Sequence, residues 1–335
     1  MSQRISRRKF LALAGASGVG LGLAACTPGA TPPVGTGTPA AQGVLNADEL
    51  DAMYEKAVKE FISGADVNVG KFWIPRLKPR MDGDVKVFEL ACQEISWESK
   101  PGTLIPAFAY NGRVPGPEIR VTEGDKVRVI VRNELKESTA IHWHGVLVPN
   151  TMDGVPFISQ PPIKSGQTFA YDFVAKPFGS HTYHSFHNAA EQMAKGLFAP
   201  FIVEPKDKKA EPSFDSDYTI VLNDARNGAM VNGKIFPGTA PITAKQGERV
   251  RIRFMNGGWL DHSIHLHGNP MQIIAQDGWV LPTPQYRDTL DLASGQRLDV
   301  IVECQEPGVW AISQMSANVE SMRGRFGMVM ALMVR

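Results

Sequence analysis

The sequence predicts an all-β protein in which two β-sandwich domains follow a short N-terminal helix. Its 335 residues are enough for two ordinary domains, each with a sizeable core. Glycine and proline are plentiful, at 32 and 24 residues, and stretches with helical periodicity are few. Short runs of alternating residues between Gly/Pro turns, among them 85–95 and 126–131, are typical of β-strands.

The charge balance excludes one class of partner. The chain has 35 basic and 34 acidic residues, so its charges nearly cancel. Without a basic excess there is no electrostatic attraction for nucleic acid. We therefore expect no nucleic-acid partner.

Residues 1–26 resemble an export signal rather than part of a fold. The pair Arg7-Arg8 precedes an apolar run that ends at Ala25, a pattern similar to a twin-arginine signal. Residues 23–26, with the sequence Leu-Ala-Ala-Cys, resemble a lipobox, which implies a lipidated N-terminus at Cys26. The Pro/Gly/Thr-rich residues 27–44 then form a tether.

These features predict a lipoprotein that is exported by the twin-arginine route. A lipid anchor at Cys26 would hold it to the membrane on the extracytoplasmic side, in the periplasm or on the cell surface. A plain secretory signal with an accidental cysteine is the alternative. Export permits a disulfide between Cys92 and Cys304, but both lie in apolar strand-like runs, which favours buried free thiols.

One amphipathic helix is predicted over residues 47–63, within an N-terminal segment 45–83. Asn46 is placed to cap it, with Glu49 at the third helical position as in a capping box. Apolar residues recur at helical spacing from Leu50 to Ile62. The mixed charge of the helix favours packing on the body of the protein over lying on a membrane.

The remaining chain divides into two sets of predicted strands. The first domain is expected over 84–205, the second over 217–335, and the charged, Pro-containing residues 206–216 form a linker between them. Residues 121–129 (VTEGDKVRV) and 244–252 (AKQGERVRI) echo each other, which suggests two copies of one fold. The alternative is that many glycine turns before a basic strand look alike.

All eight histidines fall within two short windows, 142–187 and 262–267. Two His-x-His-Gly pairs place imidazoles at positions i and i+2, which point to the same face of a β-strand. His181, His184 and His187 form a third cluster between them. This clustering favours a metal site over scattered packing residues, and neutral imidazole suits copper, zinc, iron or nickel.

The order of motifs resembles the multicopper oxidase family over roughly residues 84–335, most of all two-domain laccases and copper nitrite reductases. This resemblance implies two cupredoxin-like Greek-key β-sandwich domains and copper as the cofactor. The matching segments are His142-Trp143-His144-Gly145, Met152-Asp153-Gly154-Val155-Pro156-Phe157, the stretch 179–204, His262-Ser263-Ile264-His265-Leu266-His267-Gly268, and Asp288-Thr289-Leu290.

The resemblance also implies roles for single residues. Members of the family oxidise substrate at a type 1 copper and reduce dioxygen at a trinuclear cluster, which in two-domain members lies between neighbouring chains, usually of a trimer. His142 and His265 match type 2 copper ligands, His144 and His184 match ligands of one type 3 copper, and His267 matches a ligand of the other. Asp153 matches an acid that assists proton delivery, although Asp-Gly is also a common turn.

This chain departs from the family where the motif His-Cys-His-Ile-x-x-His should follow Trp310-Ala311-Ile312. The type 1 site thereby loses its thiolate and one imidazole, so no intense blue colour is expected. In the second motif the family's His-Ser-His becomes His184-Ser185-Phe186, with His187 one place late. The places of the missing motif hold Ser313, Gln314, Met315, Ser316 and Val319, and the predicted metal ligands are His142, His144, His184, His187, His265 and His267.

The sequence thus predicts a copper-dependent oxidoreductase without type 1 copper, in a homotrimer. It would act through a type 2 or residual type 2/type 3 site on a small molecule such as dioxygen or nitrite, with electrons from an external donor. Ordinary laccase activity is not expected. The alternatives are a non-catalytic copper-handling lipoprotein, to which methionines near the C-terminus could add soft ligands, and a structural pseudo-oxidase.

Overall fold

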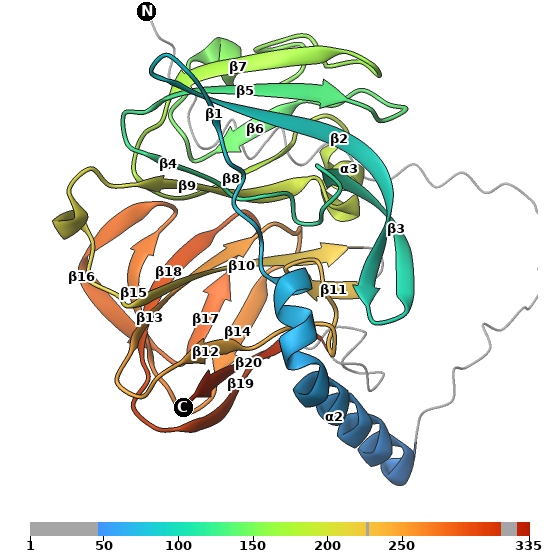
Figure 1. Cartoon of the computed structure of the whole chain (residues 1–335), viewed down its shortest axis with the longest axis vertical. Helices are drawn as coiled ribbons and strands as arrows, with labels where there is room; N and C mark the ends of the chain where they lie inside the picture. The colour runs from blue at the N-terminus through green and yellow to red at the C-terminus, as the bar shows by residue number, and fades with distance from the viewer. Residues whose placement is uncertain (1–45, 226–227, 316–326) are drawn as a thin grey trace, which may run out of the picture. The chain divides into compact units, whose positions relative to one another are not determined.

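The computed structural model describes residues 46–225, 228–315 and 327–335, and this part of the chain is mostly β-strand (Figure 1). Its strands form four sheets, two from each half of the sequence. The predicted all-β class with an N-terminal helix is therefore confirmed. The predicted signal, tether and Cys26 lie outside the described residues.

The N-terminal helix α2 spans Ala47–Phe72. The predicted capping box is present, because the Asn46 side chain accepts from the Glu49 N–H and Glu49 accepts from the Asn46 N–H, both at 2.9 Å. The helix is nine residues longer than the predicted 47–63, since Phe72 still reaches the core of the second half. In its middle, Phe61 packs in one apolar cluster with Met333 of strand β20.

No helix within the described residues is long and apolar enough to span a bilayer. Helix α2 has the length, but it carries charged residues along most of its course.

The first half is a sandwich of two sheets. One sheet contains β1 (Arg80–Asp82), β2 (Val85–Lys100), β3 (Thr103–Tyr110), β5 (Lys126–Asn133) and β7 (Thr168–Val174). The other has the order β4 (Ile119–Thr122), β9 (Phe198–Glu204), β8 (Gly179–Ser185) and β6 (Ile141–His144). Short helices η1 (Asn150–Met152) and α3 (Ala189–Lys195) lie in its loops, and η2 (Lys208–Ala210) lies between the halves.

The second half repeats this plan. One sheet has the order β11 (Gly228–Val231), β10 (Ser216–Ala225), β13 (Arg249–Asn256), β18 (Arg297–Glu303), β15 (Met271–Gln276) and β16 (Trp279–Arg287). The other has the order β12 (Ile242–Ala244), β20 (Val329–Val334), β19 (Gly308–Gln314), β14 (His262–Leu266) and β17 (Thr289–Leu292).

The order β4-β9-β8-β6 matches β12-β20-β19-β14 strand for strand. In each set the first pair is parallel and the others are antiparallel. The echoed segments occupy the same place in both halves, with a left-handed glycine in the turn, at φ 86° for Gly124 and 85° for Gly247. The internal repeat inferred from the sequence is thus a repeat of topology.

Side-chain alternation along β6 places the core and the histidines on opposite faces. Trp143 is fully buried and packs on the rings of Tyr171, Phe173 and Phe201, with centroids 5.0–5.7 Å away. Its neighbours His142 and His144 are half-buried on the other face. In β14 the core residues are Ile264 and Leu266, and the same alternation turns His265 outward.

A buried polar network joins the two halves where β8 and β9 meet β18 and β10. Asp217 of β10 accepts from Arg120 of the first half at 2.8 Å and from Arg251 and Arg253 of the second at 2.9 and 3.1 Å. Ser180 of β8 donates to Asp299 at 2.8 Å. Because both β13 arginines are buried, Asp217 neutralises charge that would otherwise be costly.

Both cysteines of this region are buried and free, as the sequence indicated. Burial raises the pKa of the Cys304 thiol to about 11 and that of Cys92 further. Neither thiol is therefore ionised at neutral pH.

The substitution Asp217→Asn should strongly destabilise the fold. It leaves the buried Arg251 and Arg253 without their shared counter-charge, a loss of about 3–5 kcal/mol in the free energy of unfolding. Urea unfolding followed by tryptophan fluorescence measures this change. The matched control is Asp84→Asn, which removes an exposed pair with Lys126 and should change stability little. Equal effects of the two substitutions would contradict the role assigned to the network.

Candidate metal centre

Three imidazoles of the first half lie together on the outer face of its β4-β9-β8-β6 sheet. His142 of β6 is directly opposite His184 of β8 in the strand register. Ring centroids are 5.4 Å apart for His142 and His184, 5.5 Å for His144 and His184, and 5.8 Å for His142 and His144. His142 and His144, two residues apart on one strand, thus point to the same face of the sheet, as strand geometry predicts.

The ring of His142 is oriented by the turn that follows η1. Its Nδ1 lies 2.9 Å from the backbone carbonyl oxygen of Asp153 and 3.4 Å from Asp153 Oδ1. The turn is held close because Gly154, at φ 79°, has no Cβ; one would lie 1.7 Å from the Ile141 carbonyl oxygen. Since Nδ1 donates to that carbonyl, the lone pair of His142 is on Nε2 and free to bind a metal.

His144 and His184 are arranged as neutral imidazoles. Burial lowers the pKa of His144 to about 3, with Arg297 and neighbouring imidazoles adding to the effect. Burial likewise lowers the pKa of His184 to about 4. His184 Nε2 and His144 Nδ1 are 3.3 Å apart, which is long for a hydrogen bond. Two nitrogens bound to one tetrahedral ion at ~2.0–2.1 Å are about 3.3 Å apart, so the pair suits a shared metal.

A second pair of imidazoles lies on β14 and the residue that follows it. The ring centroids of His265 and His267 are 4.7 Å apart. His265 Nδ1 lies 2.9 Å from the Asp288 carbonyl oxygen and 3.1 Å from Thr289 Oγ1. His265 therefore repeats the arrangement of His142, with Nδ1 on the backbone carbonyl of an aspartate and Nε2 available.

The two halves differ at the strand next to these pairs. Where β6 places His142 opposite His184, β14 places His265 opposite Ser313 of β19. Because β8 and β19 occupy equivalent places in the repeat, Ser313 stands where the first half has its third imidazole. The missing histidine noted in the sequence is thus also visible as a difference between the two copies of the fold.

One hydrogen bond joins His262 and Gln314, at the place where the family resemblance predicts a type 1 copper site. The resemblance predicts a cysteine at the position of Gln314, whose Nε2 lies 3.1 Å from Nδ1 of the buried His262. His262 Nε2 faces Asp224 Oδ1 at 3.8 Å. Met328 and Met330 are buried in the hydrophobic core, so they serve as packing residues here. Met322, Ser316 and Val319 lie outside the described residues.

The three histidines of the middle cluster, His181, His184 and His187, lie in different environments. His181 is fully buried on the face of β8 opposite His184, and its Nε2 lies 2.9 Å from the Pro177 carbonyl oxygen. Within the described residues, His187 Nδ1 is buried without a hydrogen-bond partner, and no ring contact joins it to the three grouped imidazoles. Phe186 packs on His142 instead, at 5.5 Å. The role of His187 as a ligand stays a prediction.

Arg297 lies beside the first group, and nothing in the sequence pattern pointed to it. It is buried, and it donates to the carbonyl oxygens of Ser180, Gly295 and Asp277 at 2.8–3.2 Å. Gly295 in turn lies against the His144 ring, because a Cβ there would be 2.8 Å from Cε1. A loop of the second half therefore supports a histidine of the first.

Within residues 46–225, 228–315 and 327–335, no group of three or more His, Cys, Asp or Glu side chains is arranged to hold a metal ion in the chain as it stands. What the structure provides is three imidazoles on one half and two on the other, with free Nε2 atoms on His142 and His265.

Comparisons with known proteins agree with this geometry. Two family models, each described as multicopper oxidase, match residues 91–208 and 211–316. The chain is 29% identical to copper resistance protein A of Pseudomonas syringae pv. tomato, over 59% of this chain and 42% of that protein. It is 34% identical to laccase-2 of Botryotinia fuckeliana, over 59% of this chain and 39% of that protein. The matches thus span less than half the length of these curated relatives.

Solved structures match over more of their length. A blue copper oxidase from Nitrosomonas europaea has a TM-score of 0.69 and 32% identity, over 75% of this chain and 86% of that one. A copper nitrite reductase from Nitrosomonas europaea has a TM-score of 0.67 and 26% identity, over 75% and 94%. Both halves of the fold, the family models and these relatives lead to one conclusion: the chain belongs to the multicopper oxidase family, whose members bind copper.

Proposed function

We propose that this protein is an exported copper-binding oxidoreductase that acts through a type 2, or residual type 2/type 3, copper site. The observation that carries the proposal is the matched orientation of His142 and His265. Each has Nδ1 2.9 Å from an aspartate's backbone carbonyl oxygen, which leaves Nε2 to bind a metal. The fixed orientation of these imidazoles, in addition to their presence in the sequence, supports a retained copper site.

Five residues would hold the copper: His142, His144 and His184 from the first half, and His265 and His267 from the second. Copper bound there would supply one-electron redox chemistry. The chain's own contribution is orientation and proton handling. Asp153, with its carboxylate 3.4 Å from His142 Nδ1, is placed to hold or pass a proton beside the site.

The absence of a cysteine at position 314 bears on the electron donor and on the substrate. A blue site requires a cysteine thiolate, and Gln314 is in its place, so electrons would come directly from an external donor. The acceptor would be a small molecule such as dioxygen or nitrite. Ordinary laccase activity does not fit this arrangement.

We further propose that the site is completed between chains of a homotrimer, with the first half of one chain facing the second half of its neighbour. Large apolar side chains near the first group support such an interface. Phe157 and Ile158, in the loop after Asp153, are 82% and 79% exposed, and Phe186 beside His142 is 43% exposed. Large apolar side chains that are this exposed favour a surface that is covered by a partner.

The proposed location rests on the N-terminal motifs. A twin-arginine signal and a lipid anchor at Cys26 would place the protein on the extracytoplasmic side of a membrane, in the periplasm or on the cell surface. The tether 27–44 then leads into helix α2.

A second candidate is a non-catalytic copper-handling lipoprotein. The specific observation in its favour is that Gln314, and not a thiolate, lies beside His262, with Nε2 3.1 Å from Nδ1, so a thiolate route for electron entry is missing there. Similarity to copper resistance protein A is compatible with this role. The two candidates differ in turnover, since only the first predicts reduction of dioxygen or nitrite by the copper-loaded chain.

The double substitution His142→Ala with His265→Ala should abolish tight copper binding, because it removes the two imidazoles whose Nε2 atoms are oriented for it. Copper per chain by mass spectrometry after dialysis is the measurement. The matched control is His262→Gln, beside Gln314 and outside the proposed ligand set, which should leave copper content unchanged. Full copper retention by the double variant would show that the site lies elsewhere.

Mixing the two single variants tests whether the site is shared. Chains with His142→Ala keep an intact second half, and chains with His265→Ala keep an intact first half. If equal amounts are unfolded and refolded together, random assembly of a ring gives about one quarter intact sites. Copper binding should therefore return to about a quarter of the wild-type amount. No recovery on mixing, with trimers formed, would place the whole site within one chain.

The substitution Gln314→Cys should create a copper–thiolate absorption band in the visible spectrum after addition of Cu(II). It places a thiolate beside His262, with Met328 nearby in the core. Gln314→Ser, which has no sulfur, is the control and should stay colourless at these wavelengths. Absence of the band in a folded Gln314→Cys protein would contradict the assignment of residue 314 to the former cysteine position.

A further inference from the structure

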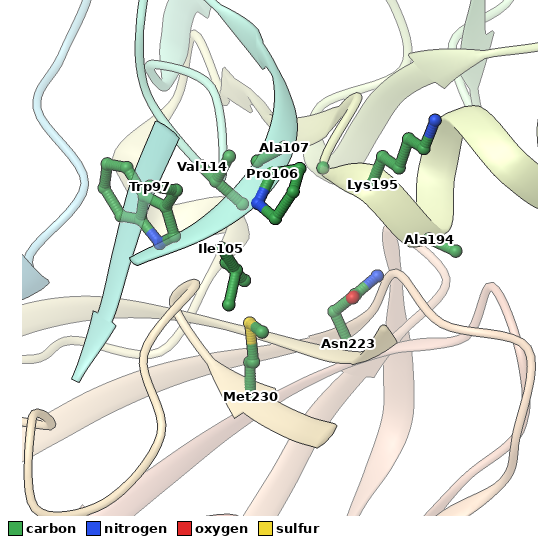
Figure 2. A pocket seen from close by; sticks show the side chains of 10 residues that line it. Trp97, Ile105, Pro106, Ala107, Val114, Ala194, Lys195, Asn223 and Met230 are labelled. Carbon is green, nitrogen blue, oxygen red and sulfur yellow. The ribbon is translucent and has the colours of Figure 1, made fainter. Parts of the chain in front are cut away.

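A cavity of about 190 Å³ lies between the two halves, among strand β3, the C-terminal end of α3 and strands β10 and β11 (Figure 2). Its inner wall is formed by Ala107, Val114, Asn223 and Met230, all buried. Pro106 is exposed at its edge. None of the copper-site histidines lines it.

The residues that line the cavity are mostly apolar, and two contacts hold the Trp97 ring in place. The Trp97 indole donates from Nε1 to the Gly233 carbonyl oxygen at 2.6 Å, and Lys234 Nζ lies 4.2 Å from its ring centroid. These two contacts fix the plane of a large ring at one side of the cavity. Ile105 is the register partner of Trp97 across β2 and β3, and Met230 of β11 lies close to Ile105 in Figure 2.

One polar atom of the wall is left without a partner. Asn223 is buried, with 3% of the residue exposed. Its Nδ2 donates to the carbonyl oxygens of Gly257 at 3.2 Å and Met193 at 3.5 Å. Within the described residues no hydrogen bond reaches Asn223 Oδ1. An amide oxygen in the wall that accepts no hydrogen bond from the protein is open to a donor, so a ligand with one N–H or O–H group could pair with it.

Lys195 carries the only ammonium group among the residues that line this cavity, and that group is already paired with a carboxylate. Lys195 Nζ lies 3.0 Å from Glu191 Oε1 and 4.3 Å from the Phe108 ring centroid. In Figure 2 the ammonium group points away from Met230 and the cavity. An anionic ligand would therefore find no counter-charge, which favours a neutral one.

We propose that this cavity binds a neutral aromatic molecule of one or two fused rings that carries a single hydrogen-bond donor. The rings would fill the space among Trp97, Ile105 and Met230, and the donor would bond Asn223 Oδ1. A cavity of about 150 Å³ is known to accept benzene, so about 190 Å³ suits a ring of this class. The proposal goes beyond the copper chemistry and does not depend on it.

Titration calorimetry of the metal-free full chain tests the proposal, with indole as the probe and 1-methylindole as the ligand without a donor. Indole should bind, and 1-methylindole should bind about tenfold more weakly because the single hydrogen bond is lost. Ala194→Leu, which fills the cavity from α3, should weaken indole binding at least about tenfold. Ala190→Leu, on the exposed face of the same helix, should leave it unchanged.

A crystal soaked with 5-bromoindole decides the location without any variant. The bromine signal is expected between Trp97 and Met230, also if Ala194→Leu does not fold. No binding of indole, equal binding of 1-methylindole, binding unaffected by Ala194→Leu, or bromine only at another site would each overturn the proposal. Since copper is absent from these measurements, their failure leaves the proposed copper function untouched.

Discussion

Side-chain alternation along two short strands is the constraint on which this site depends. In β6 the buried Trp143 lies between His142 and His144, and in β14 Ile264 and Leu266 flank His265. Packing of the apolar residues fixes the strand, and the pleat then turns the histidines to the outer face. A register slip of one residue would bury the imidazoles and expose Trp143, so core packing and metal binding select the same register.

The two halves carry the same fold but have diverged in chemistry. The first half keeps three grouped imidazoles, whereas the second keeps two and has Ser313 in the third place. Gln314 Nε2 lies 3.1 Å from His262 Nδ1, so the buried imidazole has a protein partner on one of its two nitrogens. We interpret this difference as loss of a blue copper site with retention of type 2 copper ligands, which would change the path by which electrons reach the proposed site.

Much of this could be predicted because it is local in sequence. The Asn46–Glu49 capping box, the echo around Gly124 and Gly247, and the i, i+2 histidines each follow from short-range geometry. The rest is non-local. Helix α2 continues to Phe72 because of contacts with the second half, and His142 is oriented by a carbonyl eleven residues away. Arg297 and the burial of His181 depend on how the halves meet, which no periodicity reveals.

The proposed function requires that copper binds to the histidines of a type 2 site and that no blue (type 1) copper is present. The most direct measurement is copper per chain, with electron paramagnetic resonance and visible spectra, on the full chain loaded with Cu(II). The account predicts bound copper with a type 2 signal and no intense blue band. An intense blue band, or a folded protein that binds no copper, would contradict it.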